Sequence, residues 1–232
     1  MNYVLAKNFH LVLLILIAFQ PLTQAQESNV SPGINDYYYD ADFQDWVSTF
    51  ESPGREVFDY RKRIVDSLNI QPGTSIADIG AGTGLFTMPF AYKVGPKGRV
   101  YAVDISKSFI DNIVQRAKQK GFNNVAGILN DQYTTKLPKN SIDMAFISNT
   151  YHHFEFPKSM LSSIHDALKD DGLLVIIDFQ KIRGVSSNWV MGHVRLDKLQ
   201  TIHEVEQSGY KLIGEYDFLK ENYFLVFNKI KR

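Results

Sequence analysis

The chain has 232 residues, of which 44% are hydrophobic and 22% are charged, the make-up of one ordinary globular domain. Its 25 basic side chains balance its 25 acidic ones, which argues against a nucleic-acid partner and against a strongly basic membrane-binding patch. Because the sequence contains no cysteine, disulfides, thiolate nucleophiles and cysteine-ligated metals are excluded.

The N-terminus carries a short hydrophobic run, Leu11–Phe19, preceded by Lys7 and followed by Thr23-Gln24-Ala25. A positive start, a short apolar core and a small-residue ending are typical of a secretory signal peptide. We therefore expect residues 1–25 to be removed after Ala25 and the protein to be periplasmic or secreted; without cleavage it would be cytoplasmic. As a helix the nine residues span ~14 Å, against ~30 Å for a hydrocarbon core, so no stable membrane span is expected. The alternative is a buried N-terminal helix.

Residues 26–70 are expected to form a lid and a covering helix. The first part is rich in aromatic residues without a clear period, which indicates a loop and a short helix. The cluster is either a satellite of the core or a lid, in which aromatic faces favour a bound cation. Ser52-Pro53 then predicts a helix start, and the apolar residues from Val57 to Leu68 recur at helical spacing. The aromatic residues are Tyr37, Tyr38, Tyr39, Phe43, Trp46 and Phe50.

A glycine-rich segment follows the first predicted strand, Ser75–Ile79. Gly80, Gly82 and Gly84 come next, and an apolar stretch, Leu85–Val94, predicts a helix. A strand that breaks into glycines and restarts as a helix leaves backbone N–H groups around an open crevice, which a ligand can approach closely. An ordinary glycine turn is the alternative, and two acids weigh against it.

The two acids are Asp78 and Asp104. Asp78 lies inside an apolar strand, where an ionised carboxylate is costly unless it is hydrogen-bonded. Asp104 ends the second predicted strand, Arg99–Val103, at the distance expected of an acid that holds ribose hydroxyls. Together with the glycines, they predict a nucleotide-cofactor site.

Two further strands end in polar residues that should face the same crevice. Val125–Leu129 is followed by Asn130-Asp131, and Ile142–Ser148 by Asn149-Thr150-Tyr151-His152-His153. Ligands of open α/β sheets bind outside the carboxyl ends of the strands. His152 and His153 are candidate bases, because histidine transfers protons near neutral pH, although either could simply pack. Adjacent histidines seldom reach one ion without a turn, and we expect no metal site.

The last third of the chain alternates between helix and strand. A helix around Met160–Leu168 precedes the strand Leu173–Phe179, and an insertion, Gln180–Leu196, contains the second-tier candidates His193 and Arg195. After a helix over Asp197–Gln207, two residues separate the strands Tyr210–Leu219 and Asn222–Asn228, so these strands must be antiparallel. We expect an α/β fold: a doubly wound, Rossmann-like sheet of seven strands with the last strand antiparallel.

The motif Asp78-x-Gly80-x-Gly82-x-Gly84 departs from the dinucleotide fingerprint, because Leu85 stands at the place of its third glycine. It resembles the first motif of class I S-adenosylmethionine (SAM) methyltransferases, and the resemblance extends over about residues 36–228. The branch it resembles acts on small molecules and includes quinone-biosynthesis methyltransferases.

This resemblance implies that residues 71–232 bind SAM and transfer its methyl group to a small-molecule acceptor. Tyr151 would orient the acceptor and His152 or His153 would take its proton. The alternatives are an NAD-dependent oxidoreductase and a SAM-fold protein that binds without catalysis; the acceptor and the oligomeric state stay open. The implied cofactor-binding residues are Asp78, Gly80, Ala81, Gly82, Gly84, Asp104, Ile105, Asp131 and Asn149.

Overall fold

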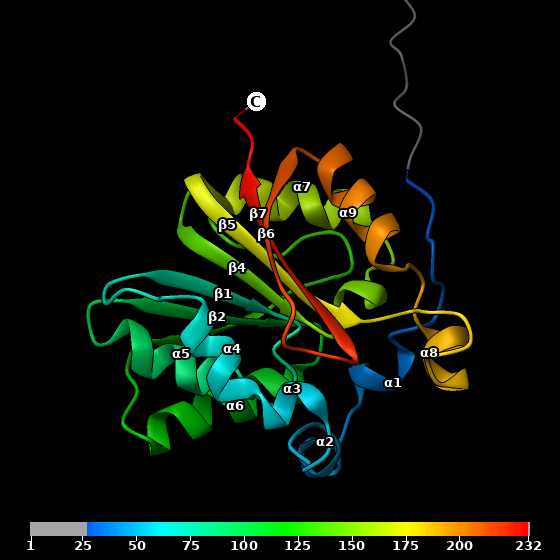
Figure 1. Ribbon diagram of the computed structural model, residues 1–232. Coiled ribbons are helices and arrows are strands. Elements are labelled where there is room, and N and C mark those ends of the chain that lie inside the picture. The colour runs from blue at the N-terminus through cyan, green and yellow to red at the C-terminus, as the bar shows by residue number, and fades with distance from the viewer. Residues whose placement is uncertain (1–26, 232) are drawn as a thin grey trace, which may run out of the picture.

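The computed structural model describes residues 27–231 (Figure 1). The expected signal peptide, residues 1–25, lies outside them. None of the helices in the described part of the chain has the length and hydrophobicity needed to cross a bilayer.

A seven-stranded sheet forms the centre of the fold, with strand order β3-β2-β1-β4-β5-β7-β6. The strands β1 to β5 pair in parallel, whereas β7 runs antiparallel to both of its neighbours, β5 and β6. This confirms the predicted fold class. The strands are β1 Ser75–Ile79, β2 Arg99–Asp104, β3 Val125–Leu129, β4 Ile142–Ser148, β5 Leu168–Phe179, β6 Tyr210–Tyr216 and β7 Asn222–Lys229.

The order of the strands determines where a ligand fits. From β1 the chain winds outward to β2 and β3, and then returns to β4 on the other side of β1. At such a switch point the connections on either side of β1 and β4 diverge and leave a crevice at the carboxyl ends of the strands. The loop after β1 and the segment after β4 both border this crevice.

Helices cover both faces of the sheet (Figure 1). On one face α4, α5 and α6 pack through buried residues that include Ile64, Phe90 and Ile113. On the other face α7 and α9 pack through Leu161 and Val205. The helices are α1 Asp36–Tyr39, α2 Phe43–Phe50, α3 Glu56–Asp59, α4 Arg61–Ser67, α5 Thr87–Val94, α6 Lys107–Gln119, α7 Pro157–Ala167, α8 Asn188–His193 and α9 Lys198–Gln207, with the 3-10 turn η1 Tyr151–His153.

The single helix expected from Ser52-Pro53 was wrong in its start and its continuity. The hydroxyl of Ser52 donates to the carbonyl of Thr49 and caps nothing, and the chain forms α3 and α4 with a break at Tyr60. Glu56 accounts for the position of α3, because its carboxylate accepts hydrogen bonds from backbone N–H groups at the start of β7. This tertiary contact outweighs the local capping signal.

Leu168 was also assigned to the wrong element. The predicted helix included it, but α7 ends at Ala167 and β5 begins at Leu168, which pairs with Ile142. The register then shifts before Met144 pairs with Leu173, so the predicted strand at Leu173 is the regular part of a longer, bulged one.

Candidate functional site

The loop after β1 strongly favours glycine at its first position. Gly80, Gly82 and Gly84 all have positive φ angles, of 69°, 54° and 83°. A Cβ atom at Gly80 would lie 2.2 Å from the Cγ2 atom of Thr150, closer than side chains tolerate. The loop therefore closely approaches the segment after β4. Its own N–H groups stabilise the turn, since Gly80 and Ala81 donate to the carbonyl of Val103 and Gly84 donates to that of Ala81.

Asp104 holds this loop in place. Its Oδ2 atom accepts a hydrogen bond from the backbone N–H of Gly82 at 2.8 Å, and its Oδ1 atom accepts one from Ser106 at 2.9 Å. The Asp104 side chain also lines the crevice. One carboxylate thus fixes the loop and also borders the crevice in which a ligand would bind.

Asp78 is buried next to the same loop, where its Oδ2 atom accepts a hydrogen bond from the hydroxyl of Thr87 at 2.6 Å. Burial, against the lowering effect of the hydrogen bonds from Thr87 and with a smaller contribution from the charge of Asp104, raises the pKa of Asp78 to about 7. Burial likewise raises the pKa of Asp104 to about 6, against the lowering effect of its backbone hydrogen bonds. Two carboxyls with raised pKa values in one crevice are typical of a functional site.

Most of the predicted cofactor-binding residues line this crevice. Gly84 does not line the crevice. A Cβ atom at this position would meet the side chain of Ile113 of α6, so the role of Gly84 is to form the turn. Asp131 lines the crevice, although its Oδ1 atom already accepts hydrogen bonds from the backbone N–H groups of Tyr133 and Thr134. The residues of the predicted set that line the crevice are Asp78, Gly80, Ala81, Gly82, Asp104, Ile105, Asp131 and Asn149.

Asn149 lines the crevice with a side chain that lacks hydrogen-bond partners. It has a φ of 50°, a left-handed conformation that costs free energy for a residue other than glycine. Its side-chain amide is buried, and neither its oxygen nor its nitrogen has a hydrogen-bond partner in the structure. A polar ligand in the crevice would supply that partner.

The aromatic residues of α1 and α2 form the wall opposite the glycine loop. The rings of Tyr38, Trp46 and Phe50 contact one another in sequence in tilted arrangements, with ring centroids 4.8 and 4.9 Å apart, and all three line the crevice. Phe43 and Phe50 also pack edge-on against Phe109 of α6. The cluster is therefore both attached to the core and positioned as a cover.

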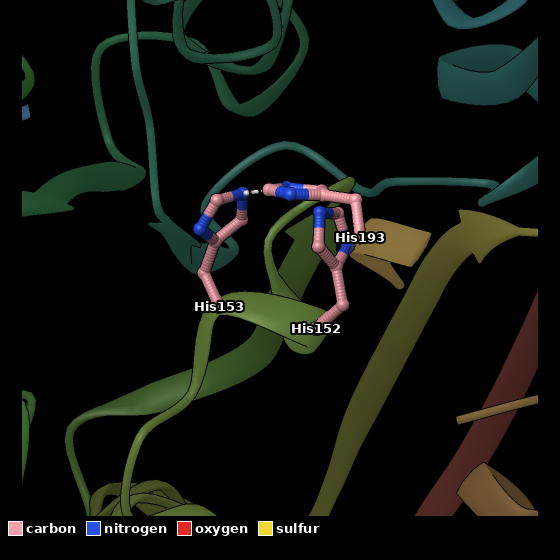
Figure 2. Close-up of side chains that lie close together, drawn as sticks. All are labelled: His152, His153 and His193. Carbon is pink, nitrogen blue, oxygen red and sulfur yellow. Dashed lines mark hydrogen bonds between the residues drawn. The ribbon is translucent and has the colours of Figure 1, made fainter. Parts of the chain in front are cut away.

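The crevice continues to a group of histidines beyond Thr150 (Figure 2). His152 is 3% exposed, and its Nδ1 atom lies 2.7 Å from Oδ1 of Asp178, which is fully buried in β5. His153, next to it in η1, has its Nε2 atom 3.5 Å from Nε2 of His193, the last residue of α8. Burial, together with the neighbouring histidines, lowers the pKa of His153 to about 2.

Two predicted residues lie elsewhere. The hydroxyl of Tyr151 donates to Glu204 of α9 at 2.6 Å, and Arg195 donates to the same carboxylate at 2.9 and 2.6 Å. Neither side chain is among those that line the crevice. The geometry gives Tyr151 the role of tying η1 to α9 and does not support one in orienting an acceptor.

Asp178 is a candidate site residue that the sequence analysis did not select, and the structure places it beside His152. It interrupts an apolar strand in the same way as Asp78, and that was the available signal. The sequence does not indicate that His152 is the partner of Asp178, because the two residues lie 26 positions apart in the chain.

The sequence of this chain resembles those of known proteins. Residues 70–216 match the family model described as "Methyltransferase domain". A demethylmenaquinone methyltransferase from Geobacillus stearothermophilus is 29% identical over 119 residues, which are 51% of this chain and 51% of that protein. The chain thus spans about half the length of the curated relatives it matches.

Solved structures share the fold. A SAM-dependent methyltransferase from Aquifex aeolicus superposes with a TM-score of 0.72 at 21% identity, over 82% of this chain and 100% of the other. A magnesium protoporphyrin IX methyltransferase from Synechocystis, crystallised with bound SAH, does so with a TM-score of 0.62 at 18% identity, over 84% and 97%.

Proposed function

This chain belongs to the methyltransferase-domain family, and we propose that it transfers a methyl group from SAM to a small-molecule acceptor. One observation carries the proposal: the hydrogen bond from the Gly82 N–H to Asp104 joins the loop after β1 to the end of β2 at the switch point of the sheet. This holds Gly80, Gly82 and a carboxylate around one crevice, which suits a ligand with an amino-acid part and a ribose.

Two parts of the crevice suit the two parts of the donor. Asp104, Ile105 and Asp131 border the end toward β2 and β3, which is suited to a ribose and an adenine. Asp78 and the unpaired amide of Asn149 border the other end, suited to the charged methionine portion. The aromatic wall of Tyr38, Trp46 and Phe50 offers ring faces to a sulfonium cation.

The acceptor side lies beyond Thr150, where Phe179 and Trp189 provide flat apolar surfaces beside the histidines. Such a surface favours an aromatic or quinone-like acceptor, and a demethylmenaquinone methyltransferase is among the relatives of the chain. In the transfer, the acceptor forms a bond to the methyl carbon while the carbon–sulfur bond breaks and its electron pair stays on sulfur. The acceptor proton passes to a base, for which His152, oriented by Asp178, has the best geometry.

A turnover assay tests this function. The full chain is incubated with SAM and a panel of phenols, naphthols and reduced quinones, and the demethylated product of SAM is measured by mass spectrometry. Acceptor-dependent product supports the proposal. SAM binding without turnover on any acceptor would favour the alternative of a binding protein, and binding of NAD in place of SAM would favour an oxidoreductase.

Export is a second, separate proposal, supported by the sequence of residues 1–25 alone. Sequencing the N-terminus of the protein from its native cells tests it: a start at Gln26 supports export, and retention of Met1 contradicts it.

A further inference from the structure

Three imidazole rings meet at the acceptor side of the crevice. His152 and His153 come from η1 after β4, and His193 comes from α8, 40 residues further along the chain. One ring nitrogen from each lies within 4.8 Å of the others, and Figure 2 shows the three rings facing one another. Around a tetrahedral zinc ion, bond lengths of about 2.0–2.1 Å put ligand nitrogens ~3.3 Å apart. The pair His153–His193, at 3.5 Å, already has this spacing.

The free ring nitrogen of His152 lacks the partner that a packing role would give it. Nε2 of His152 is buried without a hydrogen-bond partner. A buried polar atom without a partner is costly, so it calls for an explanation. The neighbouring rings do not supply that partner, because the hydrogen-bond contact within the group joins Nε2 of His153 to Nε2 of His193.

Asp178 completes the pattern of a metal site. It lies 2.7 Å from Nδ1 of His152, and its other oxygen accepts the His152 backbone N–H at 3.0 Å. With the proton on Nδ1, the lone pair of Nε2 points into the cluster. A carboxylate that orients a histidine through its second nitrogen is the usual companion of a metal-bound imidazole.

We propose that His152, His153 and His193 bind one divalent transition-metal ion of the zinc type, with Asp178 as the positioning residue behind His152. Three imidazoles without thiolates suit zinc, nickel or copper ions rather than magnesium or calcium. Three protein ligands leave a fourth position open, as in catalytic zinc sites. That position faces the crevice, which the same histidines line.

The open position also defines a substrate class, in a step that rests on the proposed function. With Nε2 of His152 on the ion, the ion takes over the role proposed for His152 as a base: a phenol or enol bound there through oxygen would lose its proton to water, because the ion stabilises the oxyanion. The resulting nucleophile attacks the methyl carbon of SAM through oxygen or the adjacent carbon, and the electron pair of the breaking bond stays on sulfur. After attack through carbon, that carbon loses its own proton to water and the phenol ring becomes aromatic again. The ion enters and leaves the step unchanged.

Metal binding is tested on the untagged full chain, stripped with a chelator and titrated with zinc chloride by calorimetry. The bound ion is then counted by elemental analysis. We expect one ion per chain, and a loss of at least 100-fold in affinity for His193→Ala. Asp178→Asn should bind 10- to 100-fold more weakly. The matched control is His203→Ala, which removes an exposed histidine of α9 and should bind like the parent protein.

Thermal melting without metal shows whether each variant folds, and His193, only half-buried, is the informative position. No binding by the parent protein, or equal binding by a folded His193→Ala, would overturn the proposal. Calorimetry with SAM on the metal-free chain separates this result from the proposed function, because Asp104, Ile105 and Asp131, which border the SAM end of the crevice, are not part of the histidine group.

Discussion

Gly82 and Asp104 are joined by a hydrogen bond of 2.8 Å between the backbone N–H of one and the carboxylate of the other. Gly82 follows β1 and Asp104 is the last residue of β2, and their contact makes the glycine loop and the acid at the end of β2 a single structural unit. An acid at this place therefore has two effects on ligand binding: it shapes the loop and it faces the ligand. A change at either residue is expected to affect the other.

Gly80→Ala tests the close approach of the loop to the segment after β4. The substitution puts a Cβ atom 2.2 Å from the Thr150 side chain, at a φ of 69° that alanine disfavours. We expect a loss of about 1–3 kcal/mol in the free energy of unfolding, measured with denaturant, and a loss of SAM binding. Gly214→Ala is the control, because a Cβ atom there has no neighbour within 4 Å. Equal stability of the two variants would contradict the crowding at Gly80.

The buried acids predict an unusual dependence of stability on pH. The pKa values of Asp78 and Asp104 are raised in the folded state to about 7 and about 6, above the ordinary value of 3.8. The folded chain then binds more protons than the unfolded chain between about pH 4 and pH 7. The contribution of these carboxyls to stability is therefore greatest at low pH and falls as pH rises through that window, by up to ~1.4 kcal/mol per unit for each group.

Asp104→Asn checks this dependence, because it removes one titrating group and keeps the shape of the side chain. The difference in unfolding free energy between parent and variant should shift in favour of the variant as pH rises from 4 to 6. A difference that stays constant with pH would show that Asp104 titrates in the folded state as it does in the unfolded one.

His152→Ala tests the acceptor side of the crevice. As a base or as a metal ligand, His152 acts through its unpaired Nε2 atom, so its loss should lower the rate of methyl transfer by about 10²- to 10⁴-fold. SAM affinity should stay nearly unchanged. His153→Ala is measured beside it, with His203→Ala as the control. Full turnover by both His152→Ala and His153→Ala would mean that these histidines only pack and that catalysis depends on alignment of the acceptor.

The sheet was predictable from the sequence because its strands are continuous apolar runs, and the central strands β1 and β4 are largely buried. The bounds of Ser75–Ile79, Val125–Leu129 and Ile142–Ser148 agree with the structure, since each is an apolar run between turn signals. Local signals failed where long-range contacts decide: Glu56 positions α3 through its contacts with β7, and pairing with Ile142 draws Leu168 into β5.

The candidate site was predictable in its cofactor half and not in its acceptor half. The glycines, Asp78 and Asp104 lie close to the ends of adjacent strands, so strand order alone brings them together. The contact between His193 and His153 depends on how the insertion after β5 folds. No hydrophobic period or residue spacing in the sequence predicts that fold. For this reason the expectation of no metal site was drawn from His152 and His153 alone.

The most direct test of the central claim is calorimetric titration of the full chain with SAM and, separately, with NAD. We expect SAM to bind one per chain and NAD not to bind. Asp104→Asn should weaken SAM binding by about 10- to 150-fold, the equivalent of about 1.5–3 kcal/mol for a hydrogen bond to a charged group. The matched control, Asp111→Asn, alters an exposed acid of α6 and should bind like the parent chain. Binding of NAD without binding of SAM, or unchanged SAM affinity in Asp104→Asn, would contradict the account.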